Sequence, residues 1–504
     1  MPRSARKRIA RWIGIGLLAA WAIVGAWNVV KPMPRGVVVD GAWSALHEGD
    51  VQFLRDITAA DGYGHPIIDQ QIFDAAFRMI AAAQHFVVLD MFLFNEHRGA
   101  NAAAPVHRPL AAELTRLLID KRRADSHFRV LFITDPINDV YGGEPSPELE
   151  TLRAAGVEVV VTDLDRLRDS NPAYSALWRL AIGWWARGGP GDWPNPFDAG
   201  ANRVSLGAWA RLANFKANHR KLLVADGADG VLHGLVTSAN PHDASSQHSN
   251  VALAIRGPVL GPLLASELAI ARFSGWKGAA LAVPERAASA TANGAAEGAP
   301  ASSGAAGRIR IVTEEAIADA VVERLQSAAA GDAIDIAMFY LADRGVLRAL
   351  RDAAERGAAV RVLLDPNKDA FGREKDGIPN RPVASELVAG SEGAIRLRWY
   401  RTHGEQFHVK LVAVRGRDGY WLTLGSANLT RRNLRDYNLE ANVVVETQRE
   451  SALELAVLQW FDGLWTNRAP AGVEYTAEFG AYADPTQLHY WGYRFMEATG
   501  LSAF

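Results

Sequence analysis

The chain has 504 residues, of which 49% are hydrophobic and 22% charged, with a net charge of −2 and no cysteine. This composition is typical of a globular protein of roughly two to four domains. It excludes disulfides, zinc–thiolate sites, iron–sulfur clusters and cysteine nucleophiles. The 54 basic residues are balanced by 56 acidic ones, so the overall charge does not predict a nucleic-acid partner.

An uncharged segment at residues 12–30 follows a basic N-terminal tip. At about 1.5 Å per residue, a helix of this length spans roughly the hydrocarbon core of a bilayer. Trp12 and Trp27 stand near its ends, where indole rings favour the interface. We expect an uncleaved membrane anchor; the alternatives are a signal peptide cleaved at residues 20–22 and a buried helix of a soluble core. The basic tip predicts a cytoplasmic N-terminus and a body on the periplasmic side of a bacterial inner membrane.

Two halves of the chain repeat one pattern on either side of an Ala/Gly/Ser-rich segment at 284–307, which we interpret as a flexible linker. In each half a helix leads into an apolar strand, then a second helix and a second strand. These segments are 72–84, 86–94, 110–123 and 128–136, and then 315–329, 334–341, 344–357 and 360–366. The alternation predicts βαβ units and a largely parallel sheet. Its repetition predicts two duplicated α/β domains, at 37–283 and 308–504, behind an anchor region at 1–36.

Each half also contains a His-x-Lys triplet, then an apolar strand, then Ser-Ala-Asn. The residues concerned are His219, Lys221, Ser238 and Asn240 in the first half, and His408, Lys410, Ser426 and Asn428 in the second. Thirteen histidines and nine lysines in this chain would give about 0.2 such triplets by chance. Two of them, at equivalent places in the repeats, indicate a shared role.

The spacing of these residues suits phosphodiester chemistry. A histidine and a lysine two positions apart on a strand share one face, and pseudo-two-fold packing of the halves would bring both sets into one pocket. Ammonium, hydroxyl and amide donors can hold the non-bridging oxygens of a phosphodiester. One imidazole can attack phosphorus while the other protonates the leaving alkoxide. The intermediate is a phosphohistidine, and no metal or other cofactor is expected, because the lysines supply the positive charge.

At these residues the chain resembles the phospholipase D superfamily, whose signature is His-x-Lys-x4-Asp followed by Gly/Ser-x-Asn. The resemblance implies two tandem phospholipase-D-like α/β domains with mixed sheets flanked by helices, related by pseudo-two-fold symmetry. The first motif matches in full, and its Asp226 is implied to be structural. The second motif has Arg415 where the signature has Asp, and Asp418 is a candidate substitute.

The resemblance also implies the roles of the two histidines. His219, from the N-terminal motif, is implied to be the nucleophile and His408 the general acid. Glu440 is expected to fix the tautomer of one catalytic imidazole. Glu440 lies twelve residues after Asn428, and the residue twelve positions after Asn240 is Ala252. The other imidazole therefore either lacks a carboxylate partner or borrows one, such as Asp90.

The family fixes phosphodiester chemistry but not the substrate. We expect a phospholipid substrate held at a bilayer, with cardiolipin-synthase-like phosphatidyl transfer or phospholipase D hydrolysis as the reaction. The alternatives are an exported nuclease of the same family and a catalytically decayed membrane-binding scaffold. A nucleic-acid partner is not expected, and protein partners are left open.

Three further segments bear on the substrate. The aromatic segment 171–197 suits the head-group region of a membrane, or else forms an ordinary buried helix and loop. The aromatic tail 489–504 either lies in the head-group region as well or docks on the second domain. We expect an arginine cluster after the second motif to contact head-group phosphates or the acidic surface of a bilayer, or else only water. The residues concerned are Tyr174, Trp178, Trp184, Trp185, Trp193 and Phe197 in the aromatic segment, and Arg431, Arg432 and Arg435 in the cluster.

Overall fold

The structure is a computed structural model and describes residues 3–97, 107–197, 202–281, 305–370, 373–468, 473–502 and 504. The predicted linker at 284–307 lies outside these residues, apart from its last three positions.

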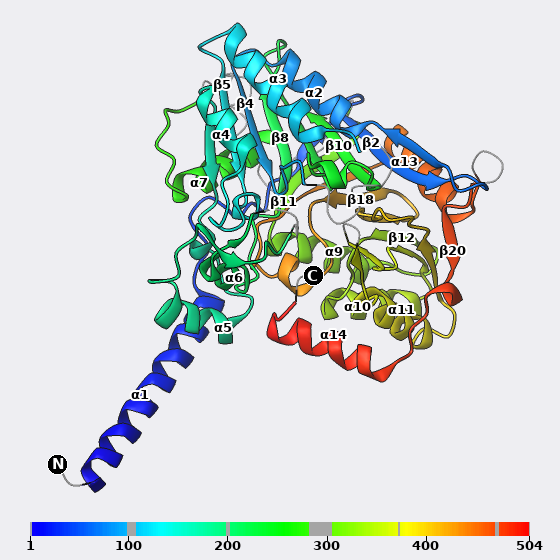
Figure 1. The fold of residues 1–504 in the computed structure, drawn as a ribbon. Coiled ribbons are helices and arrows are strands. Elements are labelled where there is room, and N and C mark those ends of the chain that lie inside the picture. Colours follow the sequence, from blue (N-terminus) through cyan, green and yellow to red (C-terminus); the bar gives the residue numbers. More distant parts are fainter. Residues whose placement is uncertain are drawn as a thin grey trace.

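A long N-terminal helix, α1 (Arg3–Val30), projects from the body of the protein (Figure 1). Among the described residues it is the one helix long and apolar enough to cross a membrane. Its C-terminal part packs on α5 (Pro172–Leu177), where the Trp21 indole donates a hydrogen bond of 2.9 Å to the Ala173 carbonyl. Gly25 permits the close approach, since a Cβ there would lie 3.4 Å from a backbone oxygen of α5. The apolar helix is therefore fixed to the first half of the chain.

Two mixed sheets form the body. The first has the order β3-β2-β10-β9-β8-β4-β5-β6 and the second the order β1-β11-β19-β18-β17-β12-β13-β16-β20. The strands of the first sheet are β2 (Val51–Ala60), β3 (Pro66–Gln70), β4 (Phe86–Met91), β5 (Arg129–Thr134), β6 (Glu158–Val161), β8 (Lys221–Asp226), β9 (Leu232–Thr237) and β10 (Asn250–Arg256). Those of the second are β1 (Ser44–Leu46), β11 (Gly307–Thr313), β12 (Ala333–Met338), β13 (Ala359–Leu364), β16 (Ile395–Tyr400), β17 (Lys410–Arg415), β18 (Tyr420–Gly425), β19 (Ala441–Thr447) and β20 (Thr476–Glu478). Outside them lie β7 (Pro190–Trp193) and the pair β14 (Asp369–Ala370) and β15 (Arg373–Glu374).

Seven strands follow one another in the same order in both sheets, which agrees with an internal duplication. The expectation of a largely parallel sheet is wrong. Only β4, β5 and β6, and their counterparts β12, β13 and β16, run parallel, while the remaining pairs within each sheet are antiparallel. One strand also crosses between the halves: β1, early in the chain, pairs with β11 of the second sheet.

The sheets pack face to face, with helices on their outer sides (Figure 1). Along β4, Phe86 and Val88 belong to the core between the sheets, whereas Val87 and Leu89 pack outward beneath α2 and α3. This period-two alternation follows from the pleat of a strand buried on both faces. The helices are α2 (Ile72–Ala82), α3 (Leu110–Ala124), α4 (Pro147–Ala154), α6 (Leu206–Leu212), α7 (Leu260–Phe273), α9 (Glu315–Ser327), α10 (Arg344–Glu355), α11 (Asn380–Ala389), α12 (Arg431–Leu434), α13 (Ala452–Trp465) and α14 (Gln487–Thr499).

A buried ionic cluster joins the two halves behind the first motif. Arg220, the middle residue of the first His-x-Lys triplet, is fully buried and points away from the two residues that flank it. Its guanidinium lies 2.7 Å from a carboxylate oxygen of Glu267 in the first half and 2.7 Å from one of Glu314 in the second. Because a buried charge is costly unless it is paired, these contacts fix the halves against each other.

Candidate active site

The two motifs meet where the sheets face each other. The His219 backbone N–H donates to the Leu439 carbonyl at 2.9 Å, and the His408 N–H donates to the Ser249 carbonyl at 2.9 Å. Each motif is thus hydrogen-bonded to the other half of the chain by an equivalent bond. Both histidine rings line one cavity of about 270 Å³, so the pseudo-symmetric convergence expected from the sequence is the observed arrangement.

His219 is held by a buried carboxylate. Its Nδ1 lies 2.8 and 3.1 Å from the two carboxylate oxygens of Glu440, which also accept hydrogen bonds from Ser426 and Asn433. Burial alone would raise the pKa of Glu440, but His219, Lys221 and these hydrogen bonds hold that pKa below its usual value. An ionised Glu440 keeps a proton on Nδ1 of the ring and leaves the lone pair on Nε2.

Burial lowers the pKa of His219 to about 4, although Glu440 opposes the shift. The imidazole is therefore neutral near pH 7, which is the protonation state that a nucleophile requires.

His408 has no carboxylate partner at Nδ1. This nitrogen lies 2.9 Å from the Ser238 carbonyl oxygen and 3.2 Å from Oδ1 of Asn250. The Ser238 hydroxyl donates to the same Asn250 oxygen at 3.0 Å, just as Ser426 donates to Glu440 in the other half. Burial and the charge of Lys410 lower the pKa of His408 well below its ordinary value. The counterpart of Glu440 is thus an amide, which makes the two histidines chemically unequal.

These positions correct two expectations. The counterpart of Glu440 is Asn250 and not Ala252, because the stretch from Asn240 to Asn250 is two residues shorter than that from Asn428 to Glu440. Asp90 does not serve His408 either, since its carboxylate accepts hydrogen bonds of 2.9 and 2.8 Å from the Asn218 amide.

Both lysines of the motifs are fully buried behind the histidines. Lys221 donates to the His219 carbonyl at 2.7 Å and Lys410 to the His408 carbonyl at 2.9 Å. Burial lowers the pKa of Lys221 to about 7, against the attraction of nearby carboxylates, and lowers that of Lys410 well below its usual value. An anion in the cavity would favour the protonated lysines and be stabilised by them.

The two asparagines of the motifs line the cavity, whereas Ser238 and Ser426 lie behind it and position other groups. Asn240 accepts a hydrogen bond of 3.2 Å from the Leu93 backbone N–H. Within the described residues, the buried Oδ1 of Asn428 has no hydrogen-bond partner. An orphaned buried acceptor is costly, by about 1–3 kcal/mol, and suggests a donor on a bound molecule.

Asp226 lies away from the cavity, at the end of β8, and its structural role stays a prediction. It accepts hydrogen bonds of 3.0–3.2 Å from the backbone N–H groups of residues 84–86 and fixes the start of β4. The second half has no equivalent among the described residues. Asp418 is exposed in the turn between β17 and β18, and no hydrogen bond joins it to the start of β12, so it does not replace the missing aspartate at Arg415.

Three further cationic side chains line the cavity: Lys216 and Lys375, which were not predicted as site residues, and Arg432 of the arginine cluster. Lys216 is paired with Asp169 at 2.8 Å, Lys375 is hydrogen-bonded to the Tyr340 hydroxyl, and Arg432 contacts the C-terminal segment through Ser502 at 3.3 Å. The scarcity of lysine in the sequence was the available signal for the first two. No group of three or more His, Asp or Glu side chains placed to hold a metal ion occurs in the described part of the chain.

The aromatic segment 171–197 divides between burial and exposure. Trp178 is buried and Phe197 lines the cavity. Trp184 and Trp185 are exposed by 77% and 50%, beside the helix that packs on α1. Only part of the segment is thus available to a membrane surface, and its interfacial role stays a prediction.

A duplicated mixed α/β fold with one histidine from each half in a single cavity is the arrangement that the resemblance to the phospholipase D superfamily implied. Comparison with known proteins agrees: the family model described as "Cardiolipin synthase, PLD-like domain" matches residues 321–465. The second half of the chain is thus similar to a phospholipase-D-like domain of the cardiolipin synthase type.

One solved structure shares the fold over nearly the whole chain, and others are less similar. Phosphatidylserine synthase from Haemophilus influenzae has a TM-score of 0.55 at 10% identity, covering 95% of this chain and 97% of that chain. The phospholipase D family member Nuc from Salmonella typhimurium has a TM-score of 0.26 at 18% identity, covering 31% and 95%. Polyphosphate kinase from Porphyromonas gingivalis has a TM-score of 0.41 at 12% identity, covering 88% and 52%. No curated protein sequence matches the chain.

Proposed function

We propose that the protein catalyses metal-independent phosphodiester transfer on glycerophospholipids, as a phosphatidyl transferase of the cardiolipin-synthase kind. Hydrolysis by a phospholipase D reaction differs only in the acceptor, which is water instead of a lipid alcohol. One observation carries the proposal: two imidazoles, each tethered at Nδ1, line the same cavity with buried lysines behind them.

The proposed reaction has two steps. In the first, Nε2 of His219 attacks phosphorus, the bond from phosphorus to the leaving alcohol oxygen breaks, and protonated His408 gives its proton to that oxygen. The phosphatidyl group is then carried on His219 through a P–N bond. In the second step His408 takes a proton from the acceptor hydroxyl, whose oxygen attacks phosphorus as the P–N bond breaks. Lys221 and Lys410 stabilise the charge of the five-coordinate transition states.

The unequal partners of the two histidines support this assignment of roles. The Glu440 carboxylate stabilises the positive charge that develops on the His219 ring when its Nε2 bonds to phosphorus. The Asn250 amide carries no charge, so it leaves His408 a weaker base and hence a stronger acid. Binding of the diester anion favours the protonated form of His408 that the first step needs.

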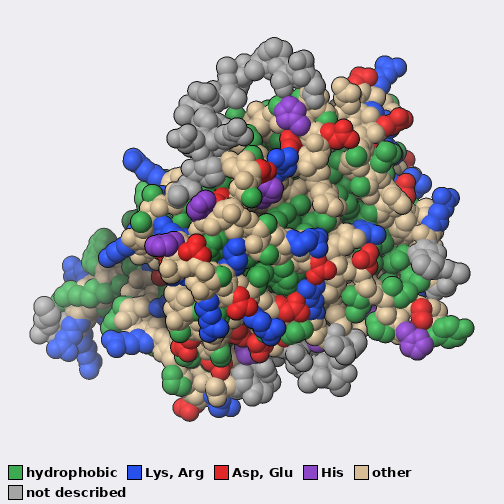
Figure 2. All heavy atoms as spheres, turned by 90° about the horizontal axis from the view of Figure 1, so that it is seen from above, with side chains coloured by type: hydrophobic (Ala, Val, Ile, Leu, Met, Phe, Trp, Pro, Cys, Tyr) green, Lys and Arg blue, Asp and Glu red, His purple; other side chains and the backbone are tan. Residues whose placement is uncertain are grey.

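Three features support a lipid substrate. The matched family model describes a cardiolipin synthase domain, α1 is long and apolar enough to cross a membrane, and exposed tryptophans lie beside α1 on the segment that holds it. On the face shown in Figure 2, cationic and anionic side chains are intermixed without a continuous basic surface of the kind that binds duplexes. The basic N-terminal tip supports a cytoplasmic N-terminus and a periplasmic body in a bacterial inner membrane.

Lipid products test the proposal most simply. The full-length protein in mixed micelles is given acyl-labelled phosphatidylglycerol with EDTA present, and the products are separated by thin-layer chromatography. A diphosphatidyl product with released glycerol indicates transfer, and phosphatidic acid indicates hydrolysis; His219→Ala and His408→Ala should each abolish both. Cleavage of DNA without lipid turnover, turnover of neither substrate, or full activity of both variants would contradict the proposal.

A further inference from the structure

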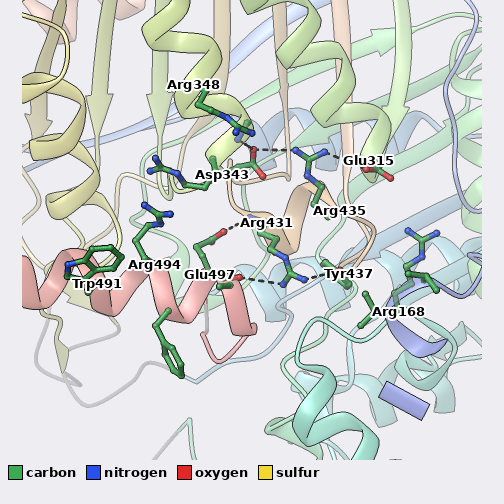
Figure 3. Close-up of a pocket in the computed structure, with 16 residues that line it drawn as sticks. Arg168, Glu315, Asp343, Arg348, Arg431, Arg435, Tyr437, Trp491, Arg494 and Glu497 are labelled. Atoms are coloured by element: carbon green, nitrogen blue, oxygen red, sulfur yellow. Dashed lines mark hydrogen bonds and ion pairs between the residues drawn. The ribbon is translucent and has the colours of Figure 1, made fainter. Parts of the chain in front are cut away.

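A second cavity, of about 870 Å³, lies apart from the active site (Figure 3). It is formed by the C-terminal end of α1, the N-terminal turns of α10, the segment around α12, and α14. It shares no lining residue with the cavity that holds the histidines. The walls therefore come from both halves of the chain and from the apolar N-terminal helix, and nothing in the proposed reaction uses them.

The charged residues of this cavity are predominantly positive. Six arginines line it against three acidic residues, and no lysine is among them. The arginines are Arg168, Arg344, Arg348, Arg431, Arg435 and Arg494. Guanidinium groups present planar, paired donors that match the oxygens of a phosphate, which ammonium groups do not.

Some of these arginines are neutralised by neighbouring carboxylates. Arg168 lies 2.7 Å from Asp436, and Arg344 lies 2.7 Å from Glu386. Arg435 makes only long contacts, of 3.5 Å each, with two carboxylates of the cavity wall. The third acidic residue of the lining, Glu497, accepts a hydrogen bond of 3.1 Å from the Arg431 backbone N–H and, within the described residues, forms no ion pair with an arginine.

Arg348, Arg431 and Arg494 supply the surplus positive charge. Among the described residues none of the three forms an ion pair with a carboxylate within 4 Å: Arg494 donates to the Tyr490 hydroxyl at 2.8 Å, and Arg431 to the Tyr437 hydroxyl at 3.0 Å. In Figure 3 the Arg431 side chain points toward Tyr437, and Glu497 lies between it and Arg494. Arg348 and Arg494, which line the same cavity from α10 and α14, are therefore the cations most available to an anion there.

The position of the cavity indicates the source of that anion. Val29 and Val30, at the end of α1, form part of its wall. Trp491 and Phe495 of α14 form another part and are exposed by 62% and 60%. In Figure 1, α14 runs across the direction of α1 at the level where α1 leaves the body. If α1 crosses a bilayer, the cavity and these rings lie at the membrane surface, where aromatic side chains favour the head-group region.

We propose that this cavity binds the phosphate of an anionic phospholipid in the bilayer that α1 enters, with the acyl chains passing Trp491 and Phe495. The proposal requires α1 to lie in a membrane but does not depend on the reaction at His219 and His408. A lipid bound there holds the body at a set tilt against the bilayer. Because Arg431 lines this cavity and the adjacent Arg432 lines the active site, the same short helix contributes to both.

The test uses the full-length protein carrying His219→Ala, so that lipid is not turned over, in detergent micelles. Native mass spectrometry measures the affinity for phosphatidylglycerol, for phosphatidylcholine and for glycerol phosphate, which has the phosphate without the chains. The test variant is Arg348→Gln with Arg494→Gln. The matched control is Arg78→Gln with Arg116→Gln, two exposed arginines on α2 and α3 at the far end of the molecule (Figure 1).

We expect one phosphatidylglycerol to bind at least about tenfold more tightly than phosphatidylcholine, and the test variant to lose about tenfold in that affinity. The control variant should stay within about twofold of the parent. Equal binding of the two lipids, an equal loss in both variants, or no loss in the test variant would overturn the proposal. Glycerol phosphate binding as tightly as phosphatidylglycerol would also overturn it, because the site would then recognise a free phosphoester.

Discussion

Glu440→Gln is the substitution that most directly tests the proposed asymmetry of the two histidines. Three donors converge on the buried Glu440 carboxylate: Nδ1 of His219, the Ser426 hydroxyl and the Asn433 amide. A glutamine has nearly the same shape but only one acceptor oxygen, and its amino group is itself a donor. At least one of the three donors must then face another donor.

The ring of His219 can relieve this conflict by moving its proton from Nδ1 to Nε2. The lone pair would then lie on the nitrogen that faces Glu440, and the nitrogen available to phosphorus would be protonated. Loss of the correct tautomer, or of a carboxylate that orients a histidine, costs on the order of 10²–10⁴-fold in rate. This corresponds to about 3–5 kcal/mol of activation free energy.

Initial rates on phosphatidylglycerol, compared with the unmodified protein at several pH values, measure this loss. The matched control is Glu446→Gln, on β19, the strand that begins directly after Glu440, in a partly exposed pair with Arg308. Exposed pairs contribute about 0–1 kcal/mol, so the rate of this variant should hardly change. Thermal unfolding of each variant separates loss of activity from loss of structure. A folded Glu440→Gln protein with a rate within about twofold of the original would refute the assignment of His219 as the nucleophile oriented by Glu440.

Three further outcomes follow from the same structure. Asn250→Asp gives His408 a carboxylate partner and should raise its pKa by about one unit or more, so activity should persist to higher pH; an unchanged pH–rate profile would count against His408 as the acid. The pKa of Lys221 is lowered to about 7, so the free protein loses this positive charge as the pH rises. We therefore expect kcat/KM for a soluble diester to fall above about pH 7. A constant kcat/KM from pH 6 to 9 would contradict this. Arg220→Met leaves two buried carboxylates unpaired and should cost about 3–5 kcal/mol of stability, more at pH 8 than at pH 5, because the carboxyl groups can take up protons at the lower pH. Thermal unfolding of this variant measures the cost, with Arg396→Gln at an exposed site as the control. Equal unfolding midpoints for the two variants would contradict the prediction.

Much of the fold could be predicted from the pattern of apolar runs. The run at 86–94 contains β4, the run at 334–341 covers all of β12 except its first residue, and the helices after them lie within one or two residues of their expected bounds. Strand direction could not be predicted, because a run buried on both faces has the same composition in a parallel and an antiparallel pair. The pairing of β1 with the second sheet joins segments more than 260 residues apart, and nothing in the local sequence indicates it.

The candidate site was predictable where its residues repeat, and was missed where the repeats differ. The two His-x-Lys triplets could be recognised because such triplets are rare and these two lie at equivalent places in the repeats. Asn250 was missed because counting from Asn240 leads to Ala252 when one loop is two residues shorter. The ion pairs of Arg220 were not predicted, because its two carboxylate partners lie far from it in sequence.

The central claim is that both histidines act on one diester, with His219 as the nucleophile, and a burst experiment tests it most directly. Bis(p-nitrophenyl) phosphate releases a stable phenolate that needs no protonation, so the first step on this substrate does not require the general acid. We predict that His408→Ala still releases about one p-nitrophenolate per protein in a rapid burst and then stalls, whereas His219→Ala releases none. A full burst from His219→Ala, or steady turnover by both variants, would contradict the account.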